Sequence, residues 1–346
     1  MSLARDIADL GAVTSRLDTV GAASGSFGIG RNVILNSAMM ISQRGTSFAS
    51  VGNVYHLDRF HFYKQNAGSA FTVSQSSVTD LAGFANALKV DCTTADTSTA
   101  SNEQAYIGYK AEGQDLQRFQ KGHATALGFT LSFYVKTNKA GVYTVKMFDR
   151  DNSRDVSGSY TVADANWNRY TINFPADTTG KFDDDNASSL EIFFNLVNGS
   201  DTQGGTLNTA WRSVADASGA TGQVNFSDST SNDWEITGIQ LETGSGTATD
   251  FEHRTFGDEL ARCQRYFYKG GSTDRLRLAQ YVSSHKGNTF FYPSTMRAAP
   301  SLSRTDVGGT ISAVASTDKS VFLYIVSATS DNTYHEANSI TLDAEL

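Results

Sequence analysis

The sequence predicts an all-β protein, with an antiparallel jelly-roll sandwich, a smaller C-terminal β domain and a short N-terminal helix. Three observations predict this class. Apolar and polar residues alternate with period two from Asn32 to Phe251, the alternating segments are rich in β-branched and aromatic residues, and clusters of Gly, Asn, Asp and Ser separate them. A chain of 346 residues with 39% apolar content can form cores of this kind.

The strands of the sandwich are expected in five alternating segments, which are FTLSFYVKT (129–137), GVYTVKMFD (141–149), RYTINFPA (169–176), SLEIFFNLV (189–197) and DWEITGIQLE (233–242). Residues 148–160 indicate a polar hairpin between two of them. Residues 176–189 and 198–213 indicate long loops, and loops at the ends of a sandwich are common binding sites.

Gly238 interrupts the last of these strands and predicts a β-bulge. We expect the turn at this glycine to split Ile236, Ile239 and Leu241 between the two faces of the strand. After this strand the chain continues into the second β domain.

An amphipathic helix is expected in the first twenty residues, where Leu3, Ile7, Leu10, Thr14 and Leu17 recur at spacings of four and three and Val13 and Val20 widen the apolar stripe. A helix of this length is marginal alone in water, so its stripe needs a partner. We expect self-association of the chain as a homotrimer through Leu3, Ile7, Leu10, Val13 and Leu17; packing of the helix on its own domain is the alternative.

Three segments are therefore expected. Residues 1–30 form the helix and an attachment segment, residues 31–254 the jelly roll, and residues 255–346 a linker helix and the C-terminal β domain. The linker helix is expected at 256–267, and the strands after it at 275–284, 288–296, 309–317, 320–329 and 339–346.

Charge excludes two classes of partner. The net charge is -8 and Lys and Arg are scattered along the chain, whereas duplex DNA and anionic membranes require a concentrated positive field. The N-terminus lacks a signal-peptide core and no run of 18 apolar residues occurs. We therefore expect synthesis in the cytoplasm, no nucleic-acid partner and no membrane insertion.

Catalytic and cofactor motifs are missing from the sequence. It contains no G-x-S-x-G, P-loop, dinucleotide fingerprint or H-E-x-x-H, so we expect neither an enzyme nor a cofactor. Cys92 and Cys263 are too few to staple the fold and lack zinc-ligand spacing, and are expected to be buried apolar residues.

Aromatic residues supply the candidates for ligand binding. Trp211 lies in a Gly-, Asn- and Thr-rich loop, where an indole face can stack on a sugar ring. Tyr55 and His56 belong to VYHLDRFHFYK, which is read either as an aromatic sugar platform or as a structural strand with an Asp58–Arg59 ion pair.

Two acidic clusters are candidate metal sites. The hairpin of Asp149, Asp151, Asn152 and Asp155 lacks the Gly and Glu of an EF-hand loop and indicates a solvated turn. The triplet of Asp183, Asp184 and Asp185 is the better cation trap, although an exposed acidic loop can also be neutralised by water alone.

Five stretches in this order, NVILNSAMMISQRG, YHLDRFHF, the long segment 233–267, MRAAPSL and terminal TLDAEL, resemble tail-fibre-like virion surface proteins of marine bacteriophages. The resemblance covers most of the chain from Asn32 onward. It implies a carbohydrate-binding-module-like jelly roll, a helical hinge and a C-terminal β domain, and it supplies no catalytic residues. Within it, Phe251 to Arg254 are expected to be structural, with Glu252 and Arg254 paired.

The leading hypothesis is a non-enzymatic virion fibre protein that is assembled in the host cytoplasm, displayed on the virion surface, and binds a host surface glycan through sandwich loops or C-terminal tips. Only about thirty residues precede the sandwich, so attachment to other virion proteins is expected through the N-terminal segment. The alternative is a purely structural capsid fibre, decoration or connector. A depolymerase built on a β-helix is disfavoured because no repeat period is visible.

Overall fold

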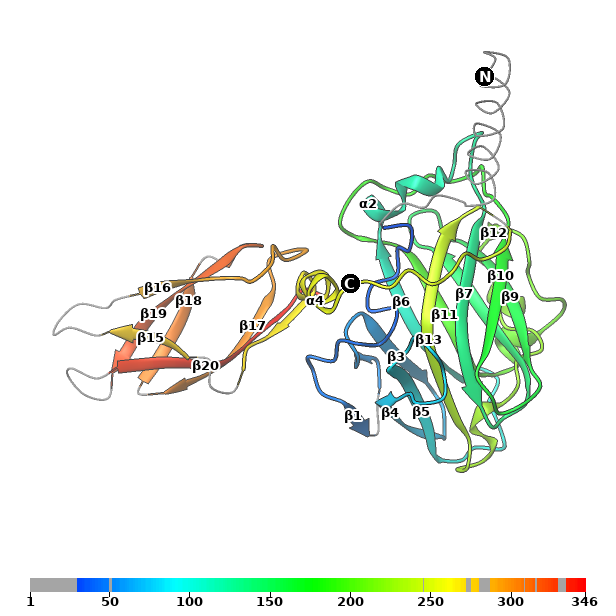
Figure 1. The fold of residues 1–346 in the computed structure, drawn as a ribbon, viewed down its shortest axis with the longest axis horizontal. Helices are drawn as coiled ribbons and strands as arrows, with labels where there is room; N and C mark the ends of the chain where they lie inside the picture. Colours follow the sequence, from blue (N-terminus) through cyan, green and yellow to red (C-terminus); the bar gives the residue numbers. More distant parts are fainter. Residues whose placement is uncertain are drawn as a thin grey trace, which may run out of the picture.

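The computed structural model describes residues 30–49, 52–244, 246–271, 275–279, 287–307, 309–314, 316–328 and 334–346. It confirms the all-β prediction, because strands form two sandwich-like units and the described helices are short (Figure 1). The expected N-terminal helix, with Leu3, Ile7, Leu10, Val13 and Leu17, lies outside the described residues.

The first sheet of the large sandwich has six strands. Their order is β1 (Ser47–Ala49), β4 (Ala70–Ser77), β5 (Asn86–Thr94), β13 (Asp233–Thr243), β7 (Phe129–Thr137) and β10 (Asn168–Phe174). Neighbouring strands are antiparallel, and β13 lies between β5 and β7. The last strand of the sandwich in sequence is therefore central in space.

The second sheet has seven strands. Their order is β12 (Arg212–Ser213), β9 (Arg154–Val162), β8 (Gly141–Asp149), β11 (Ser188–Asn198), β6 (Gln104–Glu112), β3 (Phe60–Gln65) and β2 (Val54–Tyr55). The five expected sandwich strands are present as β7, β8, β10, β11 and β13. The hairpin expected at 148–160 is shorter than predicted, because its second half is already strand β9.

Period-two alternation explains the core between the sheets. Odd-numbered residues of β7 from Phe129 to Val135 are buried, whereas Tyr134 and Lys136 face outward. On the opposite sheet β11 buries Leu190, Ile192, Phe194 and Leu196, and the rings of Phe133 and Phe194 meet edge to face with centroids 5.3 Å apart. Cys92 is buried in this core, as the sequence predicts.

Gly238 forms the predicted bulge. It has φ +62°, and the register of β13 against β7 shifts between Thr237 and Gln240. The expected split of the apolar residues is wrong: Ile236, Ile239 and Leu241 are all buried. The extra residue resets the alternation, so that an even-numbered and two odd-numbered positions face the same core.

Short helical turns connect the strands of the sandwich. They are α2 (Gly113–Leu116), η1 (Gln117–Phe119), α3 (Ser200–Gln203), η2 (Asp216–Ser218) and η3 (Phe226–Asp228). α2 lies at one end of the sandwich (Figure 1), followed directly by η1, and α3 packs against η2 and β11.

The linker helix is α4 (Phe256–Gln264), whose N-terminus is capped by the Thr255 hydroxyl accepting from the Asp258 amide. It ends earlier than predicted, because Phe267 already belongs to β14 (Phe267–Lys269), which pairs with the last strand of the chain. Cys263 is buried in α4, as expected.

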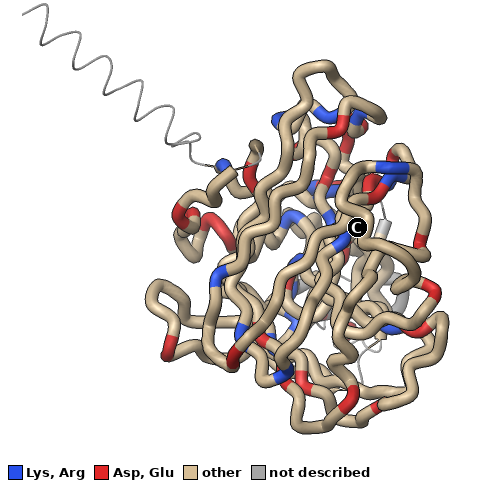
Figure 2. The backbone as a smooth tube through the Cα atoms, turned by 90° about the vertical axis from the view of Figure 1, so that its right-hand side faces the viewer, with Lys and Arg blue, Asp and Glu red and all other residues tan. Residues whose placement is uncertain are grey.

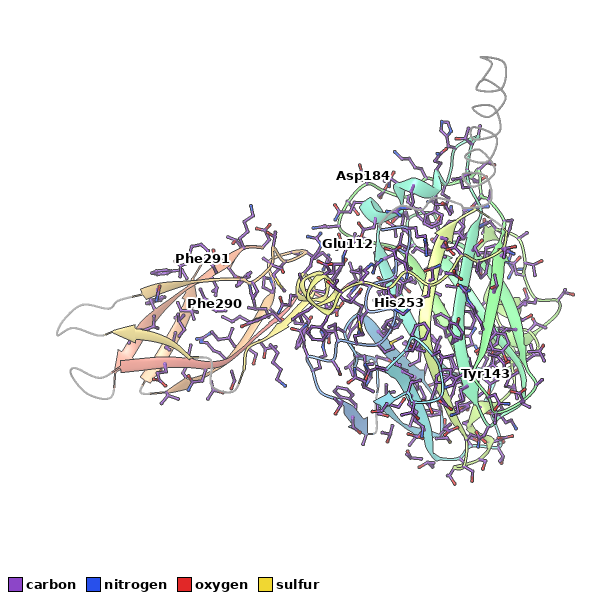
Figure 3. All side chains as sticks on the ribbon, viewed as in Figure 1. Glu112, Tyr143, Asp184, His253, Phe290 and Phe291 are labelled. Carbon is purple, nitrogen blue, oxygen red and sulfur yellow. The ribbon has the colours of Figure 1, made fainter. Side chains whose placement is uncertain are left out.

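The C-terminal unit contains β15 (Arg275–Ala279), β16 (Gly287–Phe291), β17 (Ser301–Val307), β18 (Gly309–Val314), β19 (Ser320–Ala328) and β20 (Tyr334–Asp343). β20 pairs with β14, β15 and β17, while β19 pairs with β16 and β18. Sequence reasoning missed β17, because its apolar residues are few. A separate apolar cluster fills this unit, and Phe290, labelled in Figure 3, packs against it. The segment boundaries at 30/31 and 254/255 stay predictions.

Charged residues join the C-terminal unit to the sandwich. Arg59 is fully buried and donates to Glu345, its guanidinium carbon 3.4 Å from the Tyr266 ring centroid. The expected Asp58–Arg59 pair is therefore wrong, since Asp58 instead accepts from Gln43. The end of β20 thus reaches the sandwich beside α4 (Figure 1).

The segment after β13 contributes to the same junction. Glu252 and Arg254 form the expected ion pair at 3.7 Å, and Arg254 also lies 3.3 Å from Glu259 of α4. Arg265 pairs with the buried Glu112 of β6 at 2.8 Å. These contacts confirm the structural interpretation of Glu252 and Arg254.

Candidate ligand-binding groove

The outer face of the seven-stranded sheet carries an open groove with a volume of about 440 Å³. Its floor consists of outward-facing residues of β3, β6, β11 and β8, which alternate with the core residues. Its lining residues are Gln65, Gln104, Tyr106, Lys146, Phe148, Arg150, Glu191, Phe193, Asn195, Asn198, Thr202, Val214, Asp216, Gly219 and Ala220. A volume of this size suits a small-molecule or oligomeric ligand.

Aromatic rings form one side of the groove. The Tyr63 and Tyr106 rings stack with centroids 4.7 Å apart, and the Tyr106 and Phe193 rings lie 4.5 Å apart. All three side chains are half-buried, so each ring leaves part of its surface to solvent. The register places Tyr63 opposite Tyr106 and Tyr106 opposite Asn195, which brings rings and an amide into one row across three strands.

The loop from α3 to Ala220 forms the opposite wall. The Ser157 hydroxyl donates to the Gly219 carbonyl at 2.8 Å, and the Ala220 amide donates to the Thr202 carbonyl at 2.8 Å. Gln223 accepts from both the amide and the hydroxyl of Thr144 on β8. These buried bonds hold the wall against the sheet.

Glu191 is the buried carboxylate of the groove. Its Oε1 lies 3.2 Å from Arg150 Nε and 3.7 Å from Lys110 Nζ, yet among the described residues it accepts no well-aligned hydrogen bond. Burial raises its pKa, although Lys110 and Arg150 oppose that shift. The hydrogen-bonding capacity of this oxygen is therefore not filled by the described residues, although two cations lie beside it.

Amides and a second charged group complete the polar side. Asn198 is 6% exposed, and within the described part of the chain its Oδ1 has no hydrogen-bond partner, while its Nδ2 donates to Thr202. Lys146 is held by Asp155 at 3.2 Å and Asp216 at 3.3 Å. The groove therefore contains two acceptor oxygens that accept no hydrogen bond from the described residues, the ion-paired Oε1 of Glu191 and the Oδ1 of Asn198, beside an aromatic surface.

Trp211 does not reach this groove. Its ring is half-buried against Phe129, with centroids 5.9 Å apart, and its Nε1 donates to the Pro175 carbonyl at 2.9 Å. Lys121 lies 5.0 Å from its ring centroid. These contacts use the indole for packing at the end of the sandwich.

Tyr55 and His56 do not form an exposed platform. The Tyr55 hydroxyl donates to the Leu346 carbonyl at 2.8 Å, and His56 is 1% exposed. The His56 ring meets the rings of Phe48 and Phe62 at 5.0 and 6.4 Å. VYHLDRFHFYK is a two-strand hairpin, with β2 and β3 joined by a buried turn, so we leave both residues out of the candidate site.

The two acidic clusters differ in burial. Asp183, Asp184 and Asp185 are exposed, and the described residues contain no group of three or more His, Cys, Asp or Glu side chains arranged to hold a metal. Asp149 and Asp155 are fully buried, which corrects the expectation of a solvated turn. Lysines compensate these two carboxylates, with Lys121 2.6 Å from Asp149.

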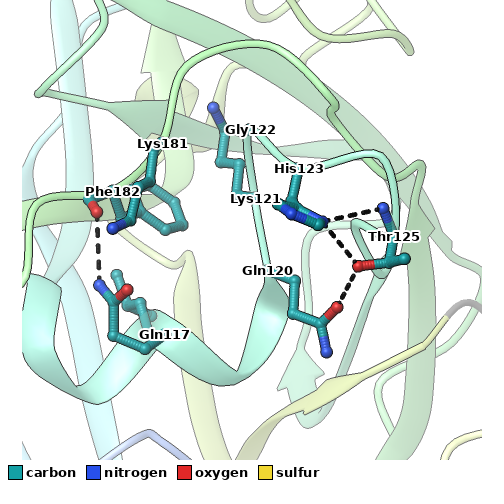
Figure 4. A pocket seen from close by; sticks show the side chains of 9 residues that line it. Gln117, Gln120, Lys121, Gly122, His123, Thr125, Lys181 and Phe182 are labelled. Carbon is teal, nitrogen blue, oxygen red and sulfur yellow. Dashed lines mark hydrogen bonds between the residues drawn. The ribbon is translucent and has the colours of Figure 1, made fainter.

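A second cavity, of about 360 Å³, lies at the end of the sandwich beside α2 and η1 (Figure 4). Lys121 in its wall is committed to Asp149, to Asp177 at 3.0 Å and to the Gly180 carbonyl at 2.8 Å. The side-chain amide of Gln117 donates to the backbone carbonyls of Gly113, Phe182 and Asp183. Because these groups brace the surrounding loops, the groove is the stronger candidate.

Sequence reasoning missed the groove residues Tyr106, Phe193 and Glu191. One signal was present: in SLEIFFNLV the residues Glu191 and Phe193 share the parity that faces away from the core. That signal does not show which strands lie side by side, and the groove crosses four of them.

Basic and acidic residues are intermixed over the view in Figure 2, without a continuous basic stripe on that side. Within the described ranges, no helix is long and apolar enough to span a bilayer.

Comparisons with known proteins complete the description. No family model and no curated protein matches this chain. Among solved structures, a protein from Bacteroides thetaiotaomicron described as a candidate sugar-binding protein is 14% identical with a TM-score of 0.34, over 61% of this chain and 99% of its own.

A family 11 carbohydrate-binding module of a Clostridium thermocellum cellulase is 12% identical with a TM-score of 0.30, over 60% of this chain and 98% of its own. A cyclase from Fischerella sp. TAU is 9% identical with a TM-score of 0.35, over 62% and 98%. At these identities and TM-scores the likenesses carry no argument about function.

Proposed function

We propose that this chain is a non-enzymatic binding protein that holds a glycan in the groove on the seven-stranded sheet. One observation carries the proposal: half-buried aromatic rings lie beside buried acceptor oxygens that accept no hydrogen bond within the described chain. Sugars match both features, since their C–H faces pack on aromatic rings and their hydroxyls donate hydrogen bonds.

The polar half of the groove favours a ligand rich in hydroxyl donors. A buried acceptor without a donor costs about 1–3 kcal/mol, so a hydroxyl that reaches Glu191 or Asn198 recovers that free energy. Fixed walls limit the ordering cost of binding, because the loop from α3 to Ala220 is already bonded to the sheet.

We further propose that this binding takes place on the surface of a bacteriophage particle. The resemblance in the sequence supports a bacteriophage fibre protein on the virion surface, probing a host surface glycan as a homotrimer. Three copies of a weak groove raise avidity by about a hundredfold or more when they bind one surface together. A shallow, open groove of modest affinity is sufficient in that arrangement.

Binding of purified protein to a glycan array, followed by calorimetry on the glycans retained, tests the proposal. Tyr106→Ala is expected to lower affinity at least tenfold, since stacking and the shape of the floor are lost. Tyr134→Ala is the matched control, because Tyr134 is a half-buried tyrosine on the other sheet. Equal affinities for the two variants, or no binding by the wild type, contradict the proposal.

A structural connector is the second candidate, favoured by the charged junction around Arg59, Glu345 and Arg265. Such a junction transmits force between two units without needing a ligand. Whole-cell binding separates the candidates: a connector does not adhere to host cells in its assembled form, whereas a glycan-binding fibre adheres and loses adhesion with Tyr106→Ala.

A further inference from the structure

Two histidines are buried in the β2–β3 hairpin. His56 and His61 are 1% and 9% exposed. Among the described residues, neither ring nitrogen of His56 has a hydrogen-bond partner, and Nδ1 of His61 has none. The His61 ring packs directly on Gly108 of β6, where an added Cβ atom would fall 2.2 Å from the ring, so the imidazole occupies space that only a glycine leaves open.

The charged groups around these rings oppose a further positive charge. Arg44 faces His56, while Lys110 and Arg59 face His61. The other contacts are aromatic, with Phe48 of β1 and Phe62 of β3 against His56, and Tyr55 of β2 and Tyr106 of β6 against His61.

The nearby carboxylates are committed to other partners. Asp58 accepts from Gln43, Glu345 pairs with Arg59 and Arg44, and Glu191 lies beside Lys110 and Arg150. A protonated imidazole in this hairpin therefore gains no direct carboxylate partner.

The same hairpin holds the C-terminal unit. Arg59 follows His56 by three residues and donates to Glu345, and Tyr55 donates to the Leu346 carbonyl. Arg44, which packs 3.5 Å from the Phe267 ring centroid, adds a contact to Asp343 at 3.4 Å. Opening the hairpin removes several of the contacts that dock β20 and β14 on the sandwich.

We propose that the β2–β3 hairpin is an acid-sensitive latch, in which protonation of His56 and His61 releases the C-terminal unit from the sandwich. Burial is the first cause that keeps both rings neutral, lowering the pKa of His56 to about 4 and that of His61 to about 3. In the open hairpin both rings regain the ordinary value of about 6.5.

The sign and size of the effect follow from proton linkage. Both histidines bind protons more tightly in the open state, so docking is complete above about pH 6.5 and weakens as the pH falls toward about 4. Each histidine multiplies the open population by about ten per pH unit in that range, and two together by about a hundred.

The two native cysteines report the opening. Cys263 of α4 is buried at the junction, near Arg59 and Glu345, whereas Cys92 is buried in the sandwich core. Labelling with 4,4′-dithiodipyridine from pH 7 to 4.5, with each rate divided by that of the urea-unfolded chain at the same pH, is expected to expose Cys263 progressively while Cys92 stays protected. Parallel exposure of both cysteines would indicate global unfolding and overturn the latch.

Variants isolate the histidines from the carboxylates. The double change His56→Phe and His61→Phe is expected to abolish the pH dependence of Cys263 labelling, and His253→Phe, at an exposed histidine, is expected to retain it. Glu345→Gln should raise labelling at every pH and keep the slope. If the double variant does not fold, the wild-type slope decides: less than a tenfold rise per pH unit between 6 and 4.5 refutes the latch.

Discussion

The two outer faces of the sandwich differ in what covers them. On the six-stranded sheet, the loop 78–85 crosses the face: Asp80 accepts from Lys136 and Trp167, and the Phe84 ring lies 5.2 Å from that of Tyr134. The segment 246–254 covers more of it. On the seven-stranded sheet the loop from α3 to Ala220 walls one side of the groove, and the half-buried rings of Tyr106 and Phe193 line it.

The covering loops, and not the strand pattern, decide which face can meet a ligand. Both sheets carry half-buried tyrosines at outward positions, Tyr134 on one and Tyr106 on the other. Tyr134 lies under Phe84 and beside Arg169, whose guanidinium carbon is 5.7 Å from its ring centroid. Equivalent residues thus serve packing on one face and are available for binding on the other.

Gly238→Ala tests the covered face most strongly. The added Cβ would lie 2.8 Å from atoms of both Phe84 and Tyr134, in a backbone with φ +62°. We expect a loss of about 3 kcal/mol in the free energy of unfolding, measured by urea denaturation, because overpacking and left-handed strain add. Gly244→Ala, with φ +96° and open space around it, is the control and should lose about 1 kcal/mol. Equal losses of unfolding free energy in the two variants would show that the Phe84 loop is not tightly packed on the sheet.

Phe84→Ala and Phe193→Ala compare the faces directly. Phe84 contacts Tyr134, Phe251 and His253, so its removal should cost about 2 kcal/mol of unfolding free energy and leave glycan affinity unchanged. Phe193→Ala should cost about 1 kcal/mol and lower glycan affinity about tenfold or more. Denaturation and calorimetry on both variants check this, and the opposite assignment of effects would contradict the comparison.

The pH dependence of binding tests the role of Glu191 on the open face. The raised pKa of Glu191 means that its carboxylate ionises at a higher pH than an ordinary glutamate. Because the ionised form is the better acceptor for sugar hydroxyls, affinity should be constant above that pKa and fall by about tenfold as the pH drops through it. Calorimetry over a pH series measures this, with Glu191→Gln as the variant that should show weaker, pH-independent binding.

Much of the large fold could be predicted from the sequence because burial enforces alternation. β7, β8, β11 and β13 have long apolar faces, so period two was visible in each. β17 was missed since SLSRTDV exposes every second residue and buries little. The end of α4 was misplaced because Phe267 is held in a strand by pairing with Asp343, a contact distant in sequence.

The candidate site was largely hidden from the sequence for the same reason. Trp211, Tyr55 and His56 were chosen as aromatic residues in or near loops, yet their partners, Pro175, Leu346 and Phe48, become neighbours only through the topology. The pairing of Tyr63, Tyr106 and Asn195 depends on strand order, which period-two patterns do not encode. Asp149 looked like a turn residue because its buried partner Lys121 lies far along the chain.

The central place of β13 constrains how the molecule can be made. Until this late segment emerges from the ribosome, β5 and β7 each have an edge whose backbone N–H and C=O groups lack a partner strand. Such edges can pair with strands of other chains. Insertion of β13 between them closes both edges in one event, through contacts that span more than a hundred residues on one side. Nascent chains halted before Asp233 should therefore be the aggregation-prone species, and maturation should be slow for a domain of this size.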